Sequence, residues 1–394
     1  MLTAWGGKAM EKKEMLTKTM LGMFIVMNFI LNMSASLFNG ILDQVAVEMN
    51  VPVTVTGQLS SMYQFGAGIG VPLFLISAGR FKRENLLKVM LGLNAVISLV
   101  MCLVYQFEAM LAVRFLMGFA GTCYSVLATA TVSAKAPAGE IGKYLSLLIG
   151  GSAVANIIGV PSIRMLSSFM GWRQIMMGLV ALMVLVLMYF TVNLKAEDNS
   201  GTQMKLRQEL AFLKEREVQM VLLCSLTVFF GYGMQVYLTP YISQLFPSYT
   251  GMISMILVFT GIASFLGNML GGTVCDQIGY QKALMLGTGL QAVTSLALLL
   301  TQFSGFMNVI LILLWMGNAW FVGLQLNTGI NVAVNNRSRF MISLNSSGIQ
   351  LGSAIGAAIA SFVIDTFGMG MIPATSMITS ILCCMIVLLN RKRA

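Results

Sequence analysis

The side chains best placed to bind a small molecule in this sequence are amides and hydroxyls that interrupt apolar runs. They are Asn28, Asn32, Ser36, Asn39, Thr122, Ser125, Asn156, Tyr232, Gln235, Asn318, Gln325, Asn327, Asn331, Asn345 and Gln350. The first four are spaced by four, four and three residues, so a helix carries them on one face. Polar groups in lipid are costly unless they face a cavity or a partner. The pattern predicts a neutral cavity for an uncharged polyol, nucleoside or amphipathic drug, with hydrogen bonding between helices as the alternative for some residues.

Two charged residues stand out as candidates for a functional role. Arg114 is the only charged residue well inside an apolar run, and a charge at such depth is functional by default. The alternative is an arginine that extends toward the headgroups from near a helix end. No acid falls in the middle of an apolar run. Asp43, near the end of the first run, is the best local candidate for a carboxylate that takes up a proton.

Several kinds of chemistry are excluded by what the sequence lacks. It contains no histidine, which removes histidine metal sites, histidine bases and Ser-His-Asp triads. The six cysteines lie in or beside apolar runs without a CxxC spacing, which is typical of small packing residues. We therefore expect no metal, no cofactor and no enzymatic activity. The net charge of +10 comes from short clusters between apolar runs, so we expect no nucleic-acid partner.

The composition indicates that these residues are carried by membrane-spanning helices. Only 10% of residues are charged and 57% are hydrophobic, whereas a soluble domain has about 25% charged residues. A spanning helix needs about 20 apolar residues. Twelve runs meet this need: 19–42, 54–78, 86–106, 109–134, 142–167, 173–194, 218–245, 251–275, 283–303, 306–333, 339–365 and 370–390. The sequence predicts an all-α membrane protein with twelve transmembrane helices.

The basic residues predict the orientation of these helices. When alternate connections are assigned to one side, that side receives 21 of the 24 lysines and arginines. Basic loops stay in the cytoplasm, so we expect both termini there and the protein in the plasma (inner) membrane. Residues 203–217, in the long polar connection, form either an amphipathic surface helix or a solvated linker.

A shift of 197 residues aligns the two halves of the chain. It places Gly151 on Gly348 and Gly159 on Gly356, each in the fifth or the eleventh run. The match predicts two pseudo-symmetric six-helix bundles, 1–194 and 218–394, joined by a cytoplasmic loop at 195–217. Gly352 continues the spacing of four in the eleventh run, and such small residues let helices approach closely. Proline at position 161 lacks an N–H and is expected to bend the outer end of its helix.

Several motifs resemble those of one transporter family. Residues 272–284, GTVCDQIGYQKAL, resemble the GxxxDxxGxxxxL loop signature of the major facilitator superfamily, with Asp276 and Gly279 at its fixed positions. The matching loop after the second run keeps basic residues at Arg80, Lys82 and Arg83 but has glycine where the aspartate belongs. Residues 114–121, RFLMGFAG, are similar to a conserved element of the fourth helix. Together with the glycines of the fifth and eleventh runs, these motifs resemble the twelve-helix drug and sugar efflux branch, which includes arabinose efflux permease-like proteins.

The resemblance implies a major facilitator fold and a function. Helices 1, 4, 7 and 10 line the cavity in this family, Asp276 latches the cytoplasmic side near Gly142, and the fifth-helix glycines form a hinge. Arg114 then has a role in proton transfer or gating. We expect a monomer that contacts membrane lipid, a small-molecule substrate and protons. The leading hypothesis is proton-coupled efflux of a small neutral or amphipathic solute. The alternatives are an uptake permease or uniporter and, from another class, a membrane signalling protein that transports nothing.

Overall fold

The computed structural model describes residues 16–78, 81–137, 139–196, 206–335 and 337–391. Within these ranges the chain is helical and has no β-strand. The helices of the first half are α1 (Lys18–Met49), α2 (Val53–Thr56), α3 (Gln58–Ala78), α4 (Arg83–Leu103), α5 (Phe107–Lys135), α6 (Ile141–Val154), the π-helix η1 (Ala155–Gly159), α7 (Val160–Leu166) and α8 (Trp172–Asn193).

The second half follows a short helical connection formed by α9 (Leu206–Ala211) and η2 (Phe212–Lys214). Its helices are α10 (Arg216–Phe229), η3 (Phe230–Tyr232), α11 (Gly233–Val236), α12 (Leu238–Leu245), η4 (Pro247–Met252), α13 (Ile253–Ile278), α14 (Tyr280–Leu300), α15 (Gly305–Ala333), α16 (Arg339–Phe367), η5 (Met369–Met371) and α17 (Ile372–Arg391). Residues 203–217 were expected to form either an amphipathic helix or a linker; the part that the structure describes holds a short helical segment that ends at Lys214, before the extended Glu215.

Eleven helical segments of the described chain are long and apolar enough to cross a membrane. They confirm an integral membrane protein. The expected count of twelve is not reached on length and composition alone, because α3 is not among the eleven. Its 21 residues nevertheless form one helix between the first and second of these segments, and it packs against α5 and α16.

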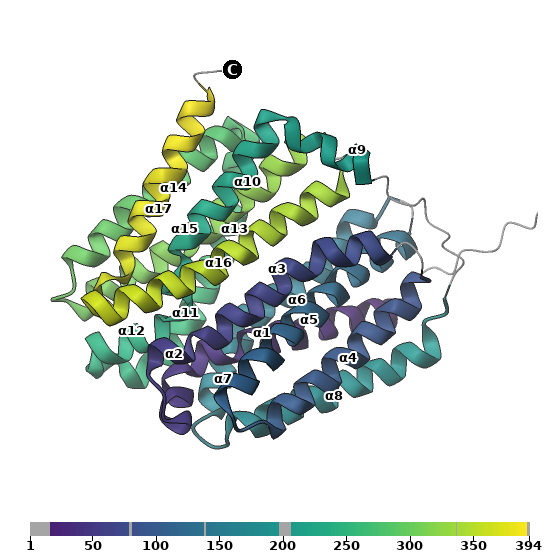
Figure 1. Cartoon of the computed structure of the whole chain (residues 1–394), viewed down its shortest axis with the longest axis horizontal. Coiled ribbons are helices and arrows are strands. Elements are labelled where there is room, and N and C mark those ends of the chain that lie inside the picture. Colours follow the sequence, from purple (N-terminus) through teal and green to yellow (C-terminus); the bar gives the residue numbers. More distant parts are fainter. Residues whose placement is uncertain (1–15, 79–80, 138, 197–205, 336, 392–394) are drawn as a thin grey trace, which may run out of the picture.

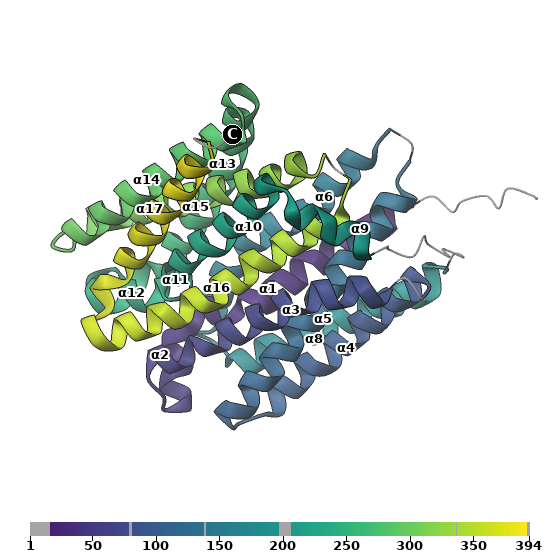
Figure 2. The same ribbon diagram turned by 45° about the horizontal axis from the view of Figure 1, so that its top comes forward.

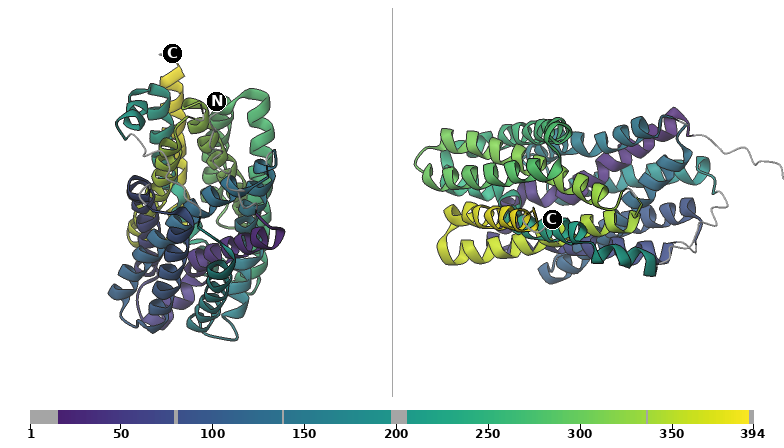
Figure 3. Two further views of the ribbon diagram at one scale, coloured as in Figure 1. Left: turned by 90° about the vertical axis from the view of Figure 1, so that its right-hand side faces the viewer. Right: turned by 90° about the horizontal axis from the view of Figure 1, so that it is seen from above.

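Two hydrophobic clusters make up the interior. One contains residues between Leu16 and Leu194, and the other residues between Val218 and Val387 together with Leu42. Figure 3 shows the corresponding separation of the colours into two groups of helices, purple to teal and green to yellow. α16 lies along α3 where the groups meet (Figure 2).

Three predicted helices differ from the structure for local reasons. The first extends to Met49, past the expected end at residue 42, and its backbone departs from helical geometry at Ile41. The fifth contains a π-turn in which the N–H of Val160 bonds to the carbonyl of Ala155, just before Pro161, whose missing N–H cannot continue the regular ladder. The seventh, expected over 218–245, is interrupted at η3 and at Tyr237.

The two halves converge at one end of the molecule. We call the end that holds the α13–α14 turn, the start of α16 and α9 the basic end, because the predicted basic loops lie there. Figure 1 shows the halves close together at the other end, near α2, α11 and α12. Toward the basic end, α17 of the second half and α4 of the first diverge. At this opposite end, Tyr237 Oη donates to Thr54 O over 2.9 Å. Ser361 Oγ donates to the same carbonyl over 3.3 Å, and Thr239 Oγ1 to Asn39 O over 3.3 Å.

Candidate functional site

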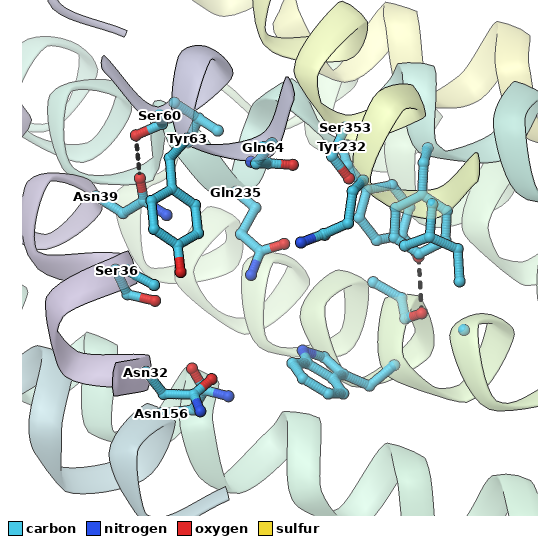
Figure 4. Close-up of a pocket in the computed structure, with 18 of the residues that line it drawn as sticks. Asn32, Ser36, Asn39, Ser60, Tyr63, Gln64, Asn156, Tyr232, Gln235 and Ser353 are labelled. Atoms are coloured by element: carbon cyan, nitrogen blue, oxygen red, sulfur yellow. Dashed lines mark hydrogen bonds between the residues drawn. The ribbon is translucent and has the colours of Figure 1, made fainter. Parts of the chain in front are cut away.

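A cavity of about 340 Å³ lies between the two halves. α1, α3, α5 and η1 of the first half face α10, η3, α11, α13, α15 and α16 of the second across it. Its volume falls in the range of small-molecule sites. Figure 4 shows side chains from both halves pointing into this space.

The cavity presents neutral polar groups with unused hydrogen-bonding capacity. The side-chain amides of Gln64, Asn156, Gln235, Asn268 and Gln350 line it, and none of them bonds to another described residue. No carboxylate is among the lining residues in the described chain. A solute that brings its own hydroxyls or carbonyls would satisfy these amides, whereas an apolar solute would leave them unpaired.

Eight of the fifteen residues predicted for the cavity line it. They are Asn32, Ser36, Asn39, Asn156, Tyr232, Gln235, Asn327 and Gln350. The stripe on α1 divides between two roles. Ser36 faces the cavity, whereas Asn28 donates to Leu148 O at 2.7 Å and to Ser152 Oγ at 2.8 Å on α6. Asn32 takes part in both, since it also donates to Ser152 Oγ at 3.0 Å.

The other predicted cavity residues lie elsewhere. On α5, Thr122 and Ser125 donate to the carbonyls of Gly118 and Gly121 one turn back in their own helix. Asn331 does the same to Asn327 O.

Three amides of the second half are fully or nearly buried between helices. Asn318 bonds to Gly287 O and to Gln291, and Gln325 bonds to Gly271 O. Asn345 joins Ser225 to Asn327. For these residues the structure has the interhelical hydrogen bonding that was the alternative to a cavity position.

Several lining residues lie outside the predicted set. On α3, Tyr63 and Gln64 lie three and four residues after Ser60, and the three share a face toward the cavity. Their spacing matches the stripe on α1 and was the signal that could have identified them. Asn268 on α13 and Ser353 on α16 also line the cavity. Asn268 follows Thr260 and Ser264 at steps of four, and Ser353 lies three residues after Gln350, so helical spacing was the available signal for them too.

Arg114 lies at the cavity wall but is fully buried. Its guanidinium donates to Leu59 O at 3.1 Å, Ser34 O at 3.2 Å and Ala35 O at 2.8 Å. It also lies over the rings of Phe38 and Tyr63, 4.9 and 4.6 Å from their centroids. The side chain therefore joins α5 to α1 and α3 and does not extend to the headgroups.

Asp43 is paired at the opposite end of the molecule. Its carboxylate receives two hydrogen bonds from Arg164 of α7, one of them 2.9 Å long from Nη2. A second ion pair joins Glu48 to Arg173, whose guanidinium lies over the rings of Tyr105 and Trp172. Both pairs tie the end of α1 to the last helices of the first half.

The predicted hinge glycines differ in how tightly they pack. A Cβ on Gly151 would lie 2.6 Å from Ile25 O of α1, and one on Gly159 would lie 2.7 Å from Met33 Cγ. In the second half, Gly352 and Gly356 meet the backbone of α10 and η3 in the same way, at 2.7 Å from Leu226 O and 2.6 Å from Phe229 O. Gly348 has no such close neighbour, and Pro161 follows the π-turn directly.

The loop motif after α13 has the geometry of its glycine but no latch contact. Gly279 has a φ of 79°, which favours glycine. Asp276 is exposed, and no described residue bonds to it; Gly142 is also exposed. In the matching loop, Arg83 pairs with Glu84 at 2.8 Å and Lys82 precedes α4. Arg80 lies outside the described residues.

Comparisons with known proteins agree on one family. The model of the Major Facilitator Superfamily matches residues 24–339 and 221–394. The uncharacterized MFS-type transporter YbcL of Bacillus subtilis (strain 168) is 27% identical, over 88% of this chain and 89% of the relative. A probable sugar efflux transporter of Helicobacter acinonychis (strain Sheeba) is 26% identical, over 87% of this chain and 90% of that protein. The inner membrane transport protein YdhP of Escherichia coli (strain K12) is 24% identical, over 90% and 91%.

Solved structures share the fold at low sequence identity. A crystal structure of a mutant of the nucleoside transporter NupG matches with a TM-score of 0.76 at 14% identity, covering 94% of this chain and 99% of that one. A partially occluded inward open conformation of the xylose transporter XylE from E. coli matches with a TM-score of 0.71 at 14% identity, covering 93% and 95%. These two matches concern the fold alone.

Proposed function

Since this chain belongs to the Major Facilitator Superfamily, a family of transporters, we propose that it is a secondary transporter that exports a small neutral or amphipathic solute by alternating access. The observation that carries the proposal is the neutral cavity between the halves, with five lining amides that have no partner among the described residues. A site of this kind favours sugars, nucleosides or neutral drugs, because each can pair with an amide without bringing a charge into the bilayer.

The direction and orientation belong to the same proposal. The basic end faces the cytoplasm of an inner membrane, as the distribution of lysine and arginine favours. The cavity then loads from the cytoplasmic side in the conformation described here, since the hydrogen bonds between Thr54 and the second half lie at the opposite end. A relative described as a probable sugar efflux transporter supports export as the direction.

Proton coupling is assigned to the ion pair between Asp43 and Arg164. Asp43 lies at the end that would face the outside and holds α1 to α7. Protonation of the carboxylate would remove its charge and weaken the pair, which links proton binding to the packing of α7 on the cavity-lining α1. The inward proton gradient would then drive export.

The proposal is tested by ligand-dependent stabilisation of the purified protein. We would screen sugars, nucleosides and neutral drugs for a rise in the unfolding temperature, because a ligand at 100 times its Kd stabilises the folded state by about 2.7 kcal/mol. Gln235→Ala should weaken the effect of any hit. Gln291→Ala is the control, since Gln291 is buried beside Asn318 and does not line the cavity. A hit whose effect survives Gln235→Ala, Asn156→Ala and Gln64→Ala would place binding elsewhere.

Export is tested in proteoliposomes with the hit that emerges. Counterflow of the labelled solute measures transport itself. An imposed pH gradient then gives the direction: accumulation against the proton flow supports an antiporter. Accumulation along it would identify an uptake permease, and no response to pH would identify a uniporter.

A further inference from the structure

A second cavity, of about 300 Å³, lies beside the central one between α6 and α13. We call it the lateral gap. It is lined by Ser146, Ile149, Gly150, Ala153, Asn156, Gly261, Ser264, Phe265, Asn268, Met269 and Trp320. Asn156, Asn268 and Trp320 also line the central cavity, so the two spaces adjoin at these three residues.

The lateral gap changes from apolar to polar along its length. Ile149, Phe265 and Met269 are 62%, 50% and 56% exposed and form an apolar rim on the surface of the helix bundle. Asn156 and Asn268 lie at its inner end, where it joins the central cavity. An apolar rim leading to unpartnered amides matches a solute with an apolar tail and a neutral polar head.

The gap exists because α13 diverges from α6. α13 is in close contact with η1, where a Cβ on Gly261 would lie 2.6 Å from Ile157 Cα. Nearer the basic end, a Cβ on Gly150 would meet nothing within 4 Å. The close contact is at the π-turn itself, and Gly150 lies before the turn, in α6. The gap therefore lies on the side of the π-turn that leads to the basic end.

The two halves also meet at a second, pseudo-symmetric boundary, and that boundary is closed. There α3 packs against α16, and a Cβ on Gly68 would lie 2.7 Å from Leu351 Cγ and 3.2 Å from Ser347 O. The opening thus belongs to one of the two related helix pairs, and splaying of the two halves alone does not account for it.

We propose that the lateral gap is a side entrance through which an amphipathic solute passes from the lipid leaflet at the basic end into the central cavity. This inference rests on the proposed function for its direction and deepens it by narrowing the substrate to a neutral polar head with an apolar tail. The head reaches Asn156 and Asn268 while the tail still contacts the rim.

The test uses Trp320, which lies where the gap meets the cavity, as a reporter. The protein is placed in vesicles of phosphatidylcholine with bromine atoms in the acyl chains, which quench tryptophan fluorescence on contact. The difference between the protein and its Trp320→Phe variant isolates the contribution of Trp320. We expect lipid quenching of this contribution, and we expect Gly150→Leu to reduce the quenching at least by half.

Gly178→Leu is the matched control. Gly178 lies in α8, away from the gap, and a Cβ there would also meet nothing within 4 Å. Both variants gain the same helix propensity, so they differ in the place of the added side chain. If Trp320 is quenched by aqueous acrylamide and not by brominated lipid, or if both leucine variants behave alike, the side entrance is wrong.

A transport measurement separates this inference from the proposed function. A bisbenzimide dye that fluoresces in the bilayer and labelled glucose serve as amphipathic and polar probes. Relative to Gly178→Leu, Gly150→Leu should slow removal of the dye from the membrane. The rate of glucose transport should be the same in the two variants. If the protein moves neither probe, the proposed function loses its support, while the quenching result still decides whether the gap opens to lipid.

Discussion

At the residue scale, Arg114 is a buried cation without a carboxylate partner among the described residues. Three backbone carbonyls and two aromatic faces surround it. Hydrogen bonds to a charged group contribute about 1.5–3 kcal/mol each, which together offsets the roughly 3 kcal/mol cost of an arginine at the centre of a membrane helix. The planar guanidinium reaches α1 and α3 at once, and the single ammonium of lysine lacks that geometry.

We therefore predict that Arg114→Lys lowers stability by about 2–4 kcal/mol, because at least one of the three carbonyls loses its donor. Thermal unfolding in detergent measures the change. Arg216→Lys is the control, because Arg216 is exposed at the start of α10. An Arg114→Lys variant of normal stability that no longer transports would instead assign the residue to proton or substrate handling.

Asp43 gives a second prediction at this scale. Asp43→Asn should retain counterflow of the substrate and lose accumulation driven by a pH gradient, since asparagine cannot bind and release the proton. Its effect on stability should be small, about 1 kcal/mol or less, because the ion pair with Arg164 is partly exposed. Glu48→Gln is the matched control in the neighbouring ion pair. Gradient-driven accumulation at the rate of the unaltered protein would remove Asp43 from the coupling mechanism.

At the element scale, the π-turn of η1 determines how Asn156 faces the cavity. A π-turn inserts one extra residue into the helix and so rotates α6, on its N-terminal side, relative to α7, on its C-terminal side. Pro161 maintains the turn because it offers no N–H for the regular bond to Ile157 O. One proline thus sets α6 and α7, which both pack on α1, at an angle to each other around Asn156.

Pro161→Ala should restore the regular helix and displace Asn156. We expect the affinity for a cavity ligand to fall about tenfold, the equivalent of one neutral hydrogen bond. The shift in unfolding temperature with ligand measures this change. Pro72→Ala is the control, since Pro72 lies inside α3 without a π-turn. Equal losses in the two variants would contradict a specific role for η1.

At the scale of the whole molecule, the two halves are held together at the end opposite the basic loops. Tyr237→Phe removes one of the hydrogen bonds that joins them. A bond worth about 0.5–1.5 kcal/mol should shift the conformational equilibrium about two- to tenfold toward the state that is open at that end. Spin labels on Val47→Cys and Phe303→Cys, two highly exposed sites near that end, would report longer distances.

Tyr241→Phe serves as the control for Tyr237→Phe, because the hydroxyl of Tyr241 bonds to Asn308 within the second half. Both variants lose one buried hydroxyl. Identical distance distributions for the two would show that the bond to Thr54 does not hold the halves together.

Asp276 should act in the opposite direction. It has no partner among the described residues in this conformation, so a latch role requires the state that is closed at the basic end. Asp276→Asn should therefore destabilise that state and increase the population with short distances between the labels on Val47→Cys and Phe303→Cys. An unchanged distribution would leave Asp276 as an ordinary solvated side chain.

The sequence by itself determined the class of protein, the family motifs and the neutral character of the site. These depend on composition and on spacing within one helix, which are local properties. The stripe on α1 and the glycine at position 279 are examples, since each follows from a period or from one backbone angle.

The tertiary structure alone decided which polar residues line the cavity. Spacing places Asn28 and Ser36 on one face of α1, but α6 lies against part of that face and leaves the rest open. Asn318 and Gln325 likewise face partners on α14 and α13. The physical reason is that a hydrogen bond satisfies an amide equally well from a neighbouring helix or from a solute. Which of the two is present depends on residues far away in the chain that fold against it.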